Sequence, residues 1–435
     1  MRTAVVAAGA MIVAAAAAVP YVSGRMLEHE IRDALDGYNK RQSLVTVSIV
    51  EYERNWLRSS FVTRLSLRDG GEVARATTRL RHAPFNGLQF ASGDSEVHFA
   101  QSYAATEQYY FDGQTPLALS FDVDFAGGTS GILRSSAVDK PVIASPNTRL
   151  VVGASSGRFS VAKDKIFRFD WSMPKVAFED PKVSIALEGL AVSGYGQLGD
   201  DDLSEPTGFK LAVASYRGEQ GGRRTAARNF SVSTQMTPSA ETLRFALAVH
   251  LGAGEVALDA TPYGWESFDL ACSLSDVQKA PVIKYSAELR SVSDVDASES
   301  QKVLLAMRAL SDLAAGLAEG EPVFAVDKLE LRTPQGNASA SMRVSIDKAR
   351  MSAGVAAWTA ADGLVMAGRA SISRSLAVRV LTAATGSEPA AQDTIAQLAA
   401  RGVVRESGDA LEFDMAARDG IYTVNGVRAS ELGRM

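Results

Sequence analysis

The stretch VEYERNWLRSSFVTRLSL, residues 50–67, decides how the first part of this chain folds. Before it, Val45, Val47 and Ile49 alternate with polar residues, and the same alternation resumes at Phe61. A period of two is typical of a half-buried β-strand. The stretch therefore predicts a corner between two strands. Its tyrosine, arginines, tryptophan and serines raise the question of whether this corner is a site of chemistry.

Alternation continues far beyond this corner and indicates a mainly β protein. Further strands are predicted in residues 73–81, 96–103, 117–125, 149–171, 183–192, 209–217, 229–236, 243–252, 255–261 and 268–276. Many of these segments have one apolar and one polar face, which favours antiparallel pairing. The polar loop at 196–208 connects two of them. No repeat of fixed period is present, so the pattern does not indicate a propeller.

Helical spacing replaces the alternation in the C-terminal half. An apolar stripe at residues 299–318 predicts one helix, which Gly320 ends. Residues 374–403 predict a second helical region, broken near Gly386. A hairpin with a turn at 333–336 lies between these helices, and another hairpin turns at Asp419 and Gly420 near the C-terminus. We expect an α+β fold: a large twisted antiparallel sheet with a few helices in the C-terminal half.

An uncharged run precedes the strands. Residues 3–24 carry no charge, and Arg2 and Arg25 flank them. A run of this length is able to cross a bilayer as a helix. Two interpretations remain open, a cleaved secretory signal and an uncleaved membrane anchor, and we favour the anchor. The chain then divides into an anchor at 1–24, a helical extension at 25–41, a β-rich region at 42–275 and an α+β region at 276–435. In this topology most of the chain is periplasmic, on a single pass through a bacterial inner membrane.

Composition excludes several classes of function. The net charge of −5 argues against a nucleic-acid partner, because such proteins carry a basic excess. The single cysteine, Cys272, excludes a disulfide framework within the chain and any cysteine-rich metal site. The four histidines are His29, His82, His98 and His250, and they lack the spacing of metal ligands. We predict no metal, no cofactor and no catalytic residue.

One motif resembles the nucleophile elbow of hydrolases. Residues 153–157 read GASSG, which matches G-x-S-x-G. That elbow requires a helix directly after its serine, whereas an alternating segment follows here. We therefore interpret these residues as a hairpin turn of small residues.

Two short motifs and the C-terminal sequence carry a family resemblance. The first motif is Tyr52-Glu53-Arg54-Asn55-Trp56, followed by Ser59 and Ser60, and the second is His82-Ala83-Pro84-Phe85. With the uncharged N-terminal run and the ending DGIYTVNGVRASEL, these motifs resemble the YdgA-like family of the bacterial envelope, a domain of unknown function. The resemblance spans nearly the whole chain. It implies an envelope location and a β-rich architecture, and no reaction.

The two motifs depart from the family pattern at one position each. Asn55 and Ala83 stand where the family has glycine. Asparagine tolerates a left-handed backbone better than other non-glycine residues, so a tight bend at Asn55 remains compatible with the pattern. We interpret the motif residues as structural or interaction residues: Tyr52, Arg54, Asn55, Trp56, Ser59, Ser60, His82, Pro84 and Phe85. On this hypothesis Tyr52 and Trp56 pack under the corner, Arg54 bonds carbonyls and the serines cap the returning strand.

These observations favour a membrane-anchored, non-enzymatic envelope protein with a structural or protein-interaction role. A first alternative is binding or transport of lipid along a groove, by analogy with envelope proteins of the AsmA type. The polar faces of residues 63–68 and 74–81 weigh against that alternative. A second alternative is an envelope hydrolase, which requires a carboxylate pair or a nucleophile and base on loops at one edge of the sheet. The expected partners are the membrane, through the N-terminal helix, and an envelope protein or lipid.

Overall fold

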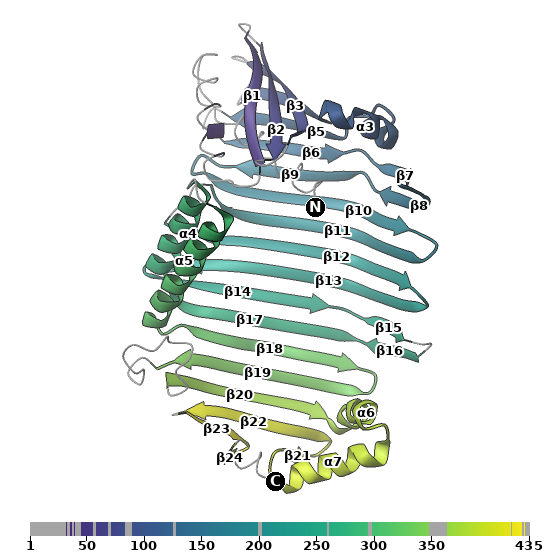
Figure 1. Ribbon diagram of the computed structural model, residues 1–435, viewed down its shortest axis with the longest axis vertical. Helices are drawn as coiled ribbons and strands as arrows, with labels where there is room; N and C mark the ends of the chain where they lie inside the picture. Colours follow the sequence, from purple (N-terminus) through teal and green to yellow (C-terminus); the bar gives the residue numbers. More distant parts are fainter. Residues whose placement is uncertain are drawn as a thin grey trace. The chain divides into compact units, whose positions relative to one another are not determined.

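A computed structural model gives the fold of the chain (Figure 1). It describes residues 32, 35–36, 39, 45–54, 58–67, 71–82, 89–124, 128–198, 202–258, 261–294, 298–347, 363–418, 420–428 and 430. The chain folds into two compact units, Met1–Gly199 and Asp200–Met435. We call them the N-terminal and the C-terminal unit. The division lies inside the region 42–275 that the alternation pattern treats as continuous.

The N-terminal unit is an antiparallel sheet, and its described elements include a short helix. Its elements are β1 (Val45–Arg54), β2 (Arg58–Leu67), β3 (Glu72–His82), β4 (Gln89–Phe99), a 3₁₀ turn (Gln101–Tyr103), α3 (Ala104–Phe111), β5 (Leu117–Asp124), β6 (Thr129–Ser135), β7 (Val138–Val142), β8 (Ser145–Val152), β9 (Ser155–Val161), β10 (Ile166–Glu179) and β11 (Val183–Gln197). Strands β1 to β6 pair in sequence, and β6 then pairs with β9. Strand β10 pairs with β11 on one side and with both β9 and β8 on the other.

The core of this unit lies on one face of its sheet. Alternate residues of β2 are buried, from Ser59 to Leu65, as the period of two requires. Phe61 and Leu65 are fully enclosed, and Phe121 of β5 and Phe159 of β9 belong to the same cluster. Leu35, from the predicted helical extension, is helical and packs into this cluster. The side-chain amide of Asn39 links this helical segment to β1. Its nitrogen donates to the Val47 carbonyl at 2.7 Å, and its oxygen accepts from the Val47 N–H at 2.8 Å.

Glycine and phenylalanine alternate across this sheet. Directly opposed residues on successive strands are Gly93, Phe121, Gly131 and Phe159, from β4, β5, β6 and β9. A Cβ atom on either glycine would collide with the ring of a neighbouring phenylalanine. Each phenylalanine ring therefore lies over a glycine of the neighbouring strand. Because glycine has no side chain, these strands leave room for the large rings on the buried face of the sheet.

The C-terminal unit is a longer antiparallel sheet with four helices among its described residues. Its elements are β12 (Thr207–Gln220), β13 (Arg223–Pro238), β14 (Thr242–Leu251), β15 (Gly254–Leu258), β16 (Thr261–Trp265), β17 (Ser267–Gln278), α4 (Lys279–Asp294), α5 (Glu299–Glu319), β18 (Val323–Thr333), β19 (Gly336–Ile346), β20 (Leu364–Ser373), α6 (Arg374–Thr385), α7 (Glu388–Ala400), β21 (Arg405–Ser407), β22 (Ala410–Arg418), β23 (Ile421–Val424) and β24 (Val427–Arg428).

Its strand order follows the chain, with one interruption. The paired series is β12, β13, β14, β17, β18, β19, β20 and β22, and every pair is antiparallel. The hairpin β15–β16 extends from β13 beside the end of β14. Strands β21 and β23 pair with the two ends of β22, and β24 pairs with β23. Figure 1 shows α4 and α5 at one end of these strands and α6 and α7 at the other.

Several predictions are confirmed. The structure is mainly β with antiparallel pairing, helix α5 matches the predicted 299–318, and α6 and α7 match the region 374–403 with its break near Gly386. Gly386 adopts a left-handed backbone, with φ of 81°, and ends α6. The predicted hairpins are β18–β19 and β22–β23.

Other features differ from the predictions. The predicted strand 96–103 ends at Phe99, a 3₁₀ turn follows at Gln101–Tyr103, and α3 then begins at Ala104, where the pattern predicts no helix. Helix α4 directly follows β17 although Pro281 resembles a breaker. Proline is tolerated in the first turn of a helix, because the N–H that it lacks has no partner there. The GASSG segment is not a hairpin turn. The chain passes from β8 into β9 through Gly153 and Ala154, and both strands pair with the same side of β10.

The predicted anchor at 1–24 lies outside the described residues. Within the ranges that the structure describes, no helix combines the length and the apolar character needed to cross a membrane.

Candidate functional site

The sheet of the C-terminal unit has one apolar face. Three adjacent strands, β14, β17 and β18, align their apolar side chains in four rows. The rows are Phe245–Leu274–Phe324, Leu247–Cys272–Val326, Val249–Leu270–Leu329 and Leu251–Phe268–Leu331. We call these twelve residues the apolar strip. Since strands rise about 3.4 Å per residue, the strip is roughly 20 Å long from Phe268 to Leu274.

A β-bulge in β18 keeps the strip continuous. The pairing shifts between Ala271 and Cys272, which leaves Asp327 as an additional residue in β18. Without this extra residue, Val326 and Leu329 would lie on opposite faces of the strand, because their separation is odd. The Ser273 hydroxyl donates to the Asp327 carboxylate at 2.7 Å and stabilises the bulge on the opposite face.

The opposite face of the same strands is polar. The His250 ring contacts the Asp269 carboxylate at 2.8 Å, and Lys328 lies 3.5 Å from the second oxygen of that carboxylate. Glu330 bridges Lys328 and Arg332, at 3.3 and 3.5 Å. The hydrogen bond from His250, with the nearby Lys328 charge, lowers the pKa of Asp269. Water solvates this polar face readily, whereas the side chains of the strip provide no strong hydrogen-bonding groups for water.

The described helices cover the apolar face only in part. Val282 of α4 and Leu317 of α5 pack against Met236, Leu243 and Val277 near one end of the strands. Helices α6 and α7 pack against Ile372 and Leu411 on β20 and β22. Packed layers normally cover the apolar face of a sheet. Here Leu247 and Phe324 of the strip remain 36 and 40 % exposed, and Phe209 beside it is 43 % exposed.

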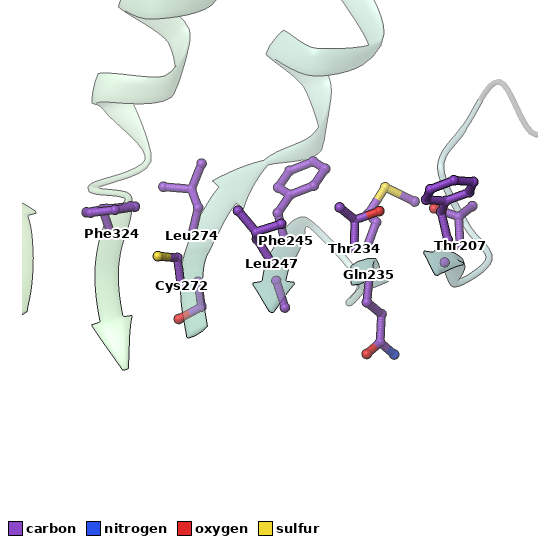
Figure 2. Close-up of a pocket in the computed structure, with 13 residues that line it drawn as sticks. Thr207, Thr234, Gln235, Phe245, Leu247, Cys272, Leu274 and Phe324 are labelled. Carbon is purple, nitrogen blue, oxygen red and sulfur yellow. The ribbon is translucent and has the colours of Figure 1, made fainter. Parts of the chain in front are cut away.

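A first groove lies over one end of the strip (Figure 2). Its volume is about 580 Å³, and its lining comes from the five adjacent strands β12, β13, β14, β17 and β18. Figure 2 shows Phe324, Leu274 and Phe245 in a row, with the amide of Gln235 pointing away from them. Cys272 lies in this groove, and burial, followed by the nearby Asp327 charge, raises the pKa of its thiol.

A second groove, of about 530 Å³, lies over the other end of the strip. Leu251, Phe268 and Leu331 form its floor, and its walls come from α6 and from the hairpin β15–β16. Trp265 of the hairpin is held in place because its indole N–H donates to the Gly252 carbonyl at 2.8 Å. Arg379 of α6 is the only charged residue in the described lining. Both volumes are in the range of roughly 300–1,000 Å³ that is usual for small-molecule sites.

Helix α5 presents a further apolar surface. Val303, Met307 and Leu310 recur at helical spacing and are 56, 63 and 54 % exposed. The predicted stripe of this helix is therefore divided. Leu317, another residue of the stripe, packs against the core, whereas these three residues face solvent.

The described motif residues belong to the N-terminal unit, whereas the strip belongs to the C-terminal unit. Tyr52 is opposite Phe61, and the two rings stack with centroids 5.9 Å apart and an interplanar angle of 9°. Ser59 is buried and pairs with Arg54, the last residue of β1. Ser60 is half-buried opposite Glu53. His82 ends β3 opposite Ala91. Asn55, Trp56, Pro84 and Phe85 lie outside the described residues.

Ser155 and His98 make structural contacts in the N-terminal unit. Ser155, the central residue of GASSG, is buried and accepts a hydrogen bond from the Trp171 indole at 3.0 Å. No helix follows it. His98 contacts the Glu107 carboxylate at 2.7 Å, and the other oxygen of Glu107 accepts from the Phe99 amide, so this pair joins α3 to β4. Among the described residues, no group of three or more His, Cys, Asp or Glu side chains lies close enough together to hold a metal ion.

Sequence reasoning found the strands of the strip but not the strip itself. The alternation in 243–252 and 268–276 shows that one side of each strand is apolar. It cannot show that three such sides align, nor that the helices leave them uncovered.

Comparison with known proteins identifies one family. The model of a family described as bacterial protein of unknown function (DUF945) matches residues 1–430. No curated protein and no solved structure matches the chain.

Proposed function

The chain belongs to the DUF945 family of bacterial proteins of unknown function, and from that premise we propose that it is a non-enzymatic envelope protein that binds a hydrophobic ligand. The ligand lies along the apolar strip of the C-terminal unit, and lipid acyl chains are its chemical class. This is the lipid-binding alternative that the sequence pattern left open. The finer YdgA-like assignment is part of the proposal, and the corner at Tyr52 supports it.

One observation carries this proposal: the strip is apolar in all four rows, and a groove lies over each of its ends. Apolar surface that stays exposed to water is unfavourable by about 25 cal/mol per Å². Continuous apolar patches on a protein surface generally mark a binding site. The polar face of the same strands argues against a second apolar layer there.

Location in the inner membrane is also part of the proposal. The uncharged run at 3–24 supports a single membrane anchor with the remaining chain in the periplasm. A reporter that is active only in the periplasm, fused to the C-terminus, tests this topology. Activity of a cytoplasmic reporter at the same position would contradict it.

Binding is tested on the purified full chain with a fluorescent long-chain fatty acid. Leu247→Gln places an amide in the strip and should weaken binding about tenfold, because burying an amide without a partner costs about 1–3 kcal/mol. Ala248→Gln is the matched control. Ala248 is the next residue of β14, exposed on the polar face, and its replacement should leave binding unchanged. Equal loss in both variants, or no binding to the wild-type chain, would refute the proposal.

A second candidate function is docking of a partner protein, and the exposed stripe of α5 favours it. Val303, Met307 and Leu310 form the kind of helical apolar face that packs against another helix. Crosslinking in living cells from a photoreactive residue at position 307 tests this function. The control is position 308 on the same helix, which is exposed and carries arginine. A protein captured at both positions, or at neither, would contradict a specific partner for this face.

A further inference from the structure

We propose that the second groove binds the anionic head of a single-chain lipid through Arg379, with the chain running along the apolar strip toward Cys272. The inference rests on the proposed function and adds the chemistry of the head group and the direction of the chain. A long-chain carboxylate is the simplest ligand of this class.

The position of Arg379 supports this assignment. Helix α6 uses two of its faces. On one face, Ala377 and Leu381 pack against the core that α6 shares with α7. On the other face, Leu376, Arg379 and Val380 line the second groove. The Arg379 guanidinium lies 5.9 Å from the centroid of the Tyr263 ring, on the opposite wall of the groove. A cation–π contact of this kind orients the guanidinium without neutralising its charge.

The charge of Arg379 is not neutralised by a carboxylate of the described residues. No ion pair joins its guanidinium to a carboxylate of any described residue, whereas Arg374 on the same helix contacts Glu406 at 3.0 Å. The remaining described lining carries no charge, and its polar groups come from Thr333, Gln335, the Tyr263 hydroxyl and the Trp265 indole. A guanidinium at the edge of an apolar groove is complementary to a carboxylate, which it binds by charge-assisted hydrogen bonds.

The strip sets the direction and the length of the ligand. From Arg379 the floor of the second groove leads through Val249 and Leu270 to Leu247 and Cys272, and no polar residue intervenes. The distance along the strip is roughly 14 Å from the row of Phe268 to the row of Cys272, and roughly 20 Å to the row of Leu274. A short chain would occupy the second groove alone.

The first experiment compares hexadecanoate with hexadecanol on the purified full chain. The wild-type chain should prefer the carboxylate by about tenfold, as one charge-assisted contact allows. Arg379→Gln should abolish this preference and leave the affinity for the alcohol unchanged, and Arg379→Lys should retain part of it. Arg343→Gln is the control, since it removes the same charge from an exposed position on the polar face.

The outcomes separate the two proposals. Equal binding of acid and alcohol to the wild-type chain would overturn the role of Arg379 and leave hydrophobic binding intact. Absence of binding for both ligands would overturn the proposed function itself.

A second experiment measures the direction of the chain without relying on a variant. Cys272 is the only cysteine, so a thiol reagent reports on one position. Hexadecanoate at saturation should slow alkylation of Cys272, and octanoate at saturation should not. Equal protection by both, or protection by neither, would overturn the proposed direction.

Discussion

Gly93 and Phe121 are directly opposed on β4 and β5, and the Phe121 ring occupies the space where a side chain of residue 93 would stand. Phe121 is itself buried and belongs to the core cluster of this unit. This relationship explains how large rings and close strands coexist in the core of the N-terminal unit.

Replacement of Gly93 by alanine should destabilise the N-terminal unit. Overpacking of a core in this way costs about 1–3 kcal/mol. Gly71→Ala is the matched control, because a Cβ atom there meets no atom within 4 Å. Urea unfolding of both variants measures the difference, and equal stability of the two would contradict the close approach of Phe121.

Truncation of Phe61 should be among the most damaging changes. Its side chain is 1 % exposed and stacks on Tyr52, so Phe61→Ala should lower the free energy of unfolding by about 3–5 kcal/mol. Phe209→Ala removes the same side chain from an exposed position and should change stability by less than about 0.5 kcal/mol. Thermal unfolding compares the two variants. A large loss for Phe209→Ala would show that the face carrying Phe209 is packed in solution.

Acid should weaken the pairing of β20, β21 and β22 through Asp414. Hydrogen bonds from Arg369 and Arg405 lower the pKa of this carboxyl below its ordinary value of 3.8. Since the folded pKa is the lower one, the contribution of Asp414 to stability is complete above the ordinary value. It is lost as the pH falls from there through the folded pKa. Melting temperatures measured across this pH range should fall less steeply for Asp414→Asn than for the wild-type chain.

Asp393→Asn provides the control for that measurement. Asp393 is exposed on α7 and makes no ion pair with the described residues. Its replacement should leave the slope unchanged, and a slope shared by all three proteins would exclude Asp414 as the cause.

The Cys272 thiol should react slowly at neutral pH. Burial and the Asp327 charge raise its pKa above the ordinary 9.0, and the thiolate is the reactive form. Alkylation by iodoacetamide should accelerate as the pH rises beyond that value. Asp327→Asn should increase the rate at a fixed pH, because it removes the negative charge that disfavours the thiolate. A rate as fast as that of a free thiol in the wild-type chain would contradict burial of this group.

The sequence predicts local structure best where the pattern is strong. The alternation around residues 50–67 identifies β1 and β2, and apolar spacing together with Gly320 identifies α5. It misses α3, because residues 104–111 end in Tyr-Tyr-Phe, which favour strands, and the preceding strand obscures the change of period. The family resemblance rests on two motifs in the N-terminal unit and on the C-terminal ending, and none of these segments contributes a residue to the strip.

By itself, the sequence determined that the chain is a β-rich protein with antiparallel strands, helices in its C-terminal half and an uncharged N-terminal run. Period and composition are local properties, and they act within a few residues. Only the tertiary structure decided which apolar faces are covered and which remain open. Covering depends on strand register, on the bulge at Asp327 and on helices that pack from distant parts of the chain. For the same reason, only the fold placed Arg379 beside Tyr263 at the end of the strip.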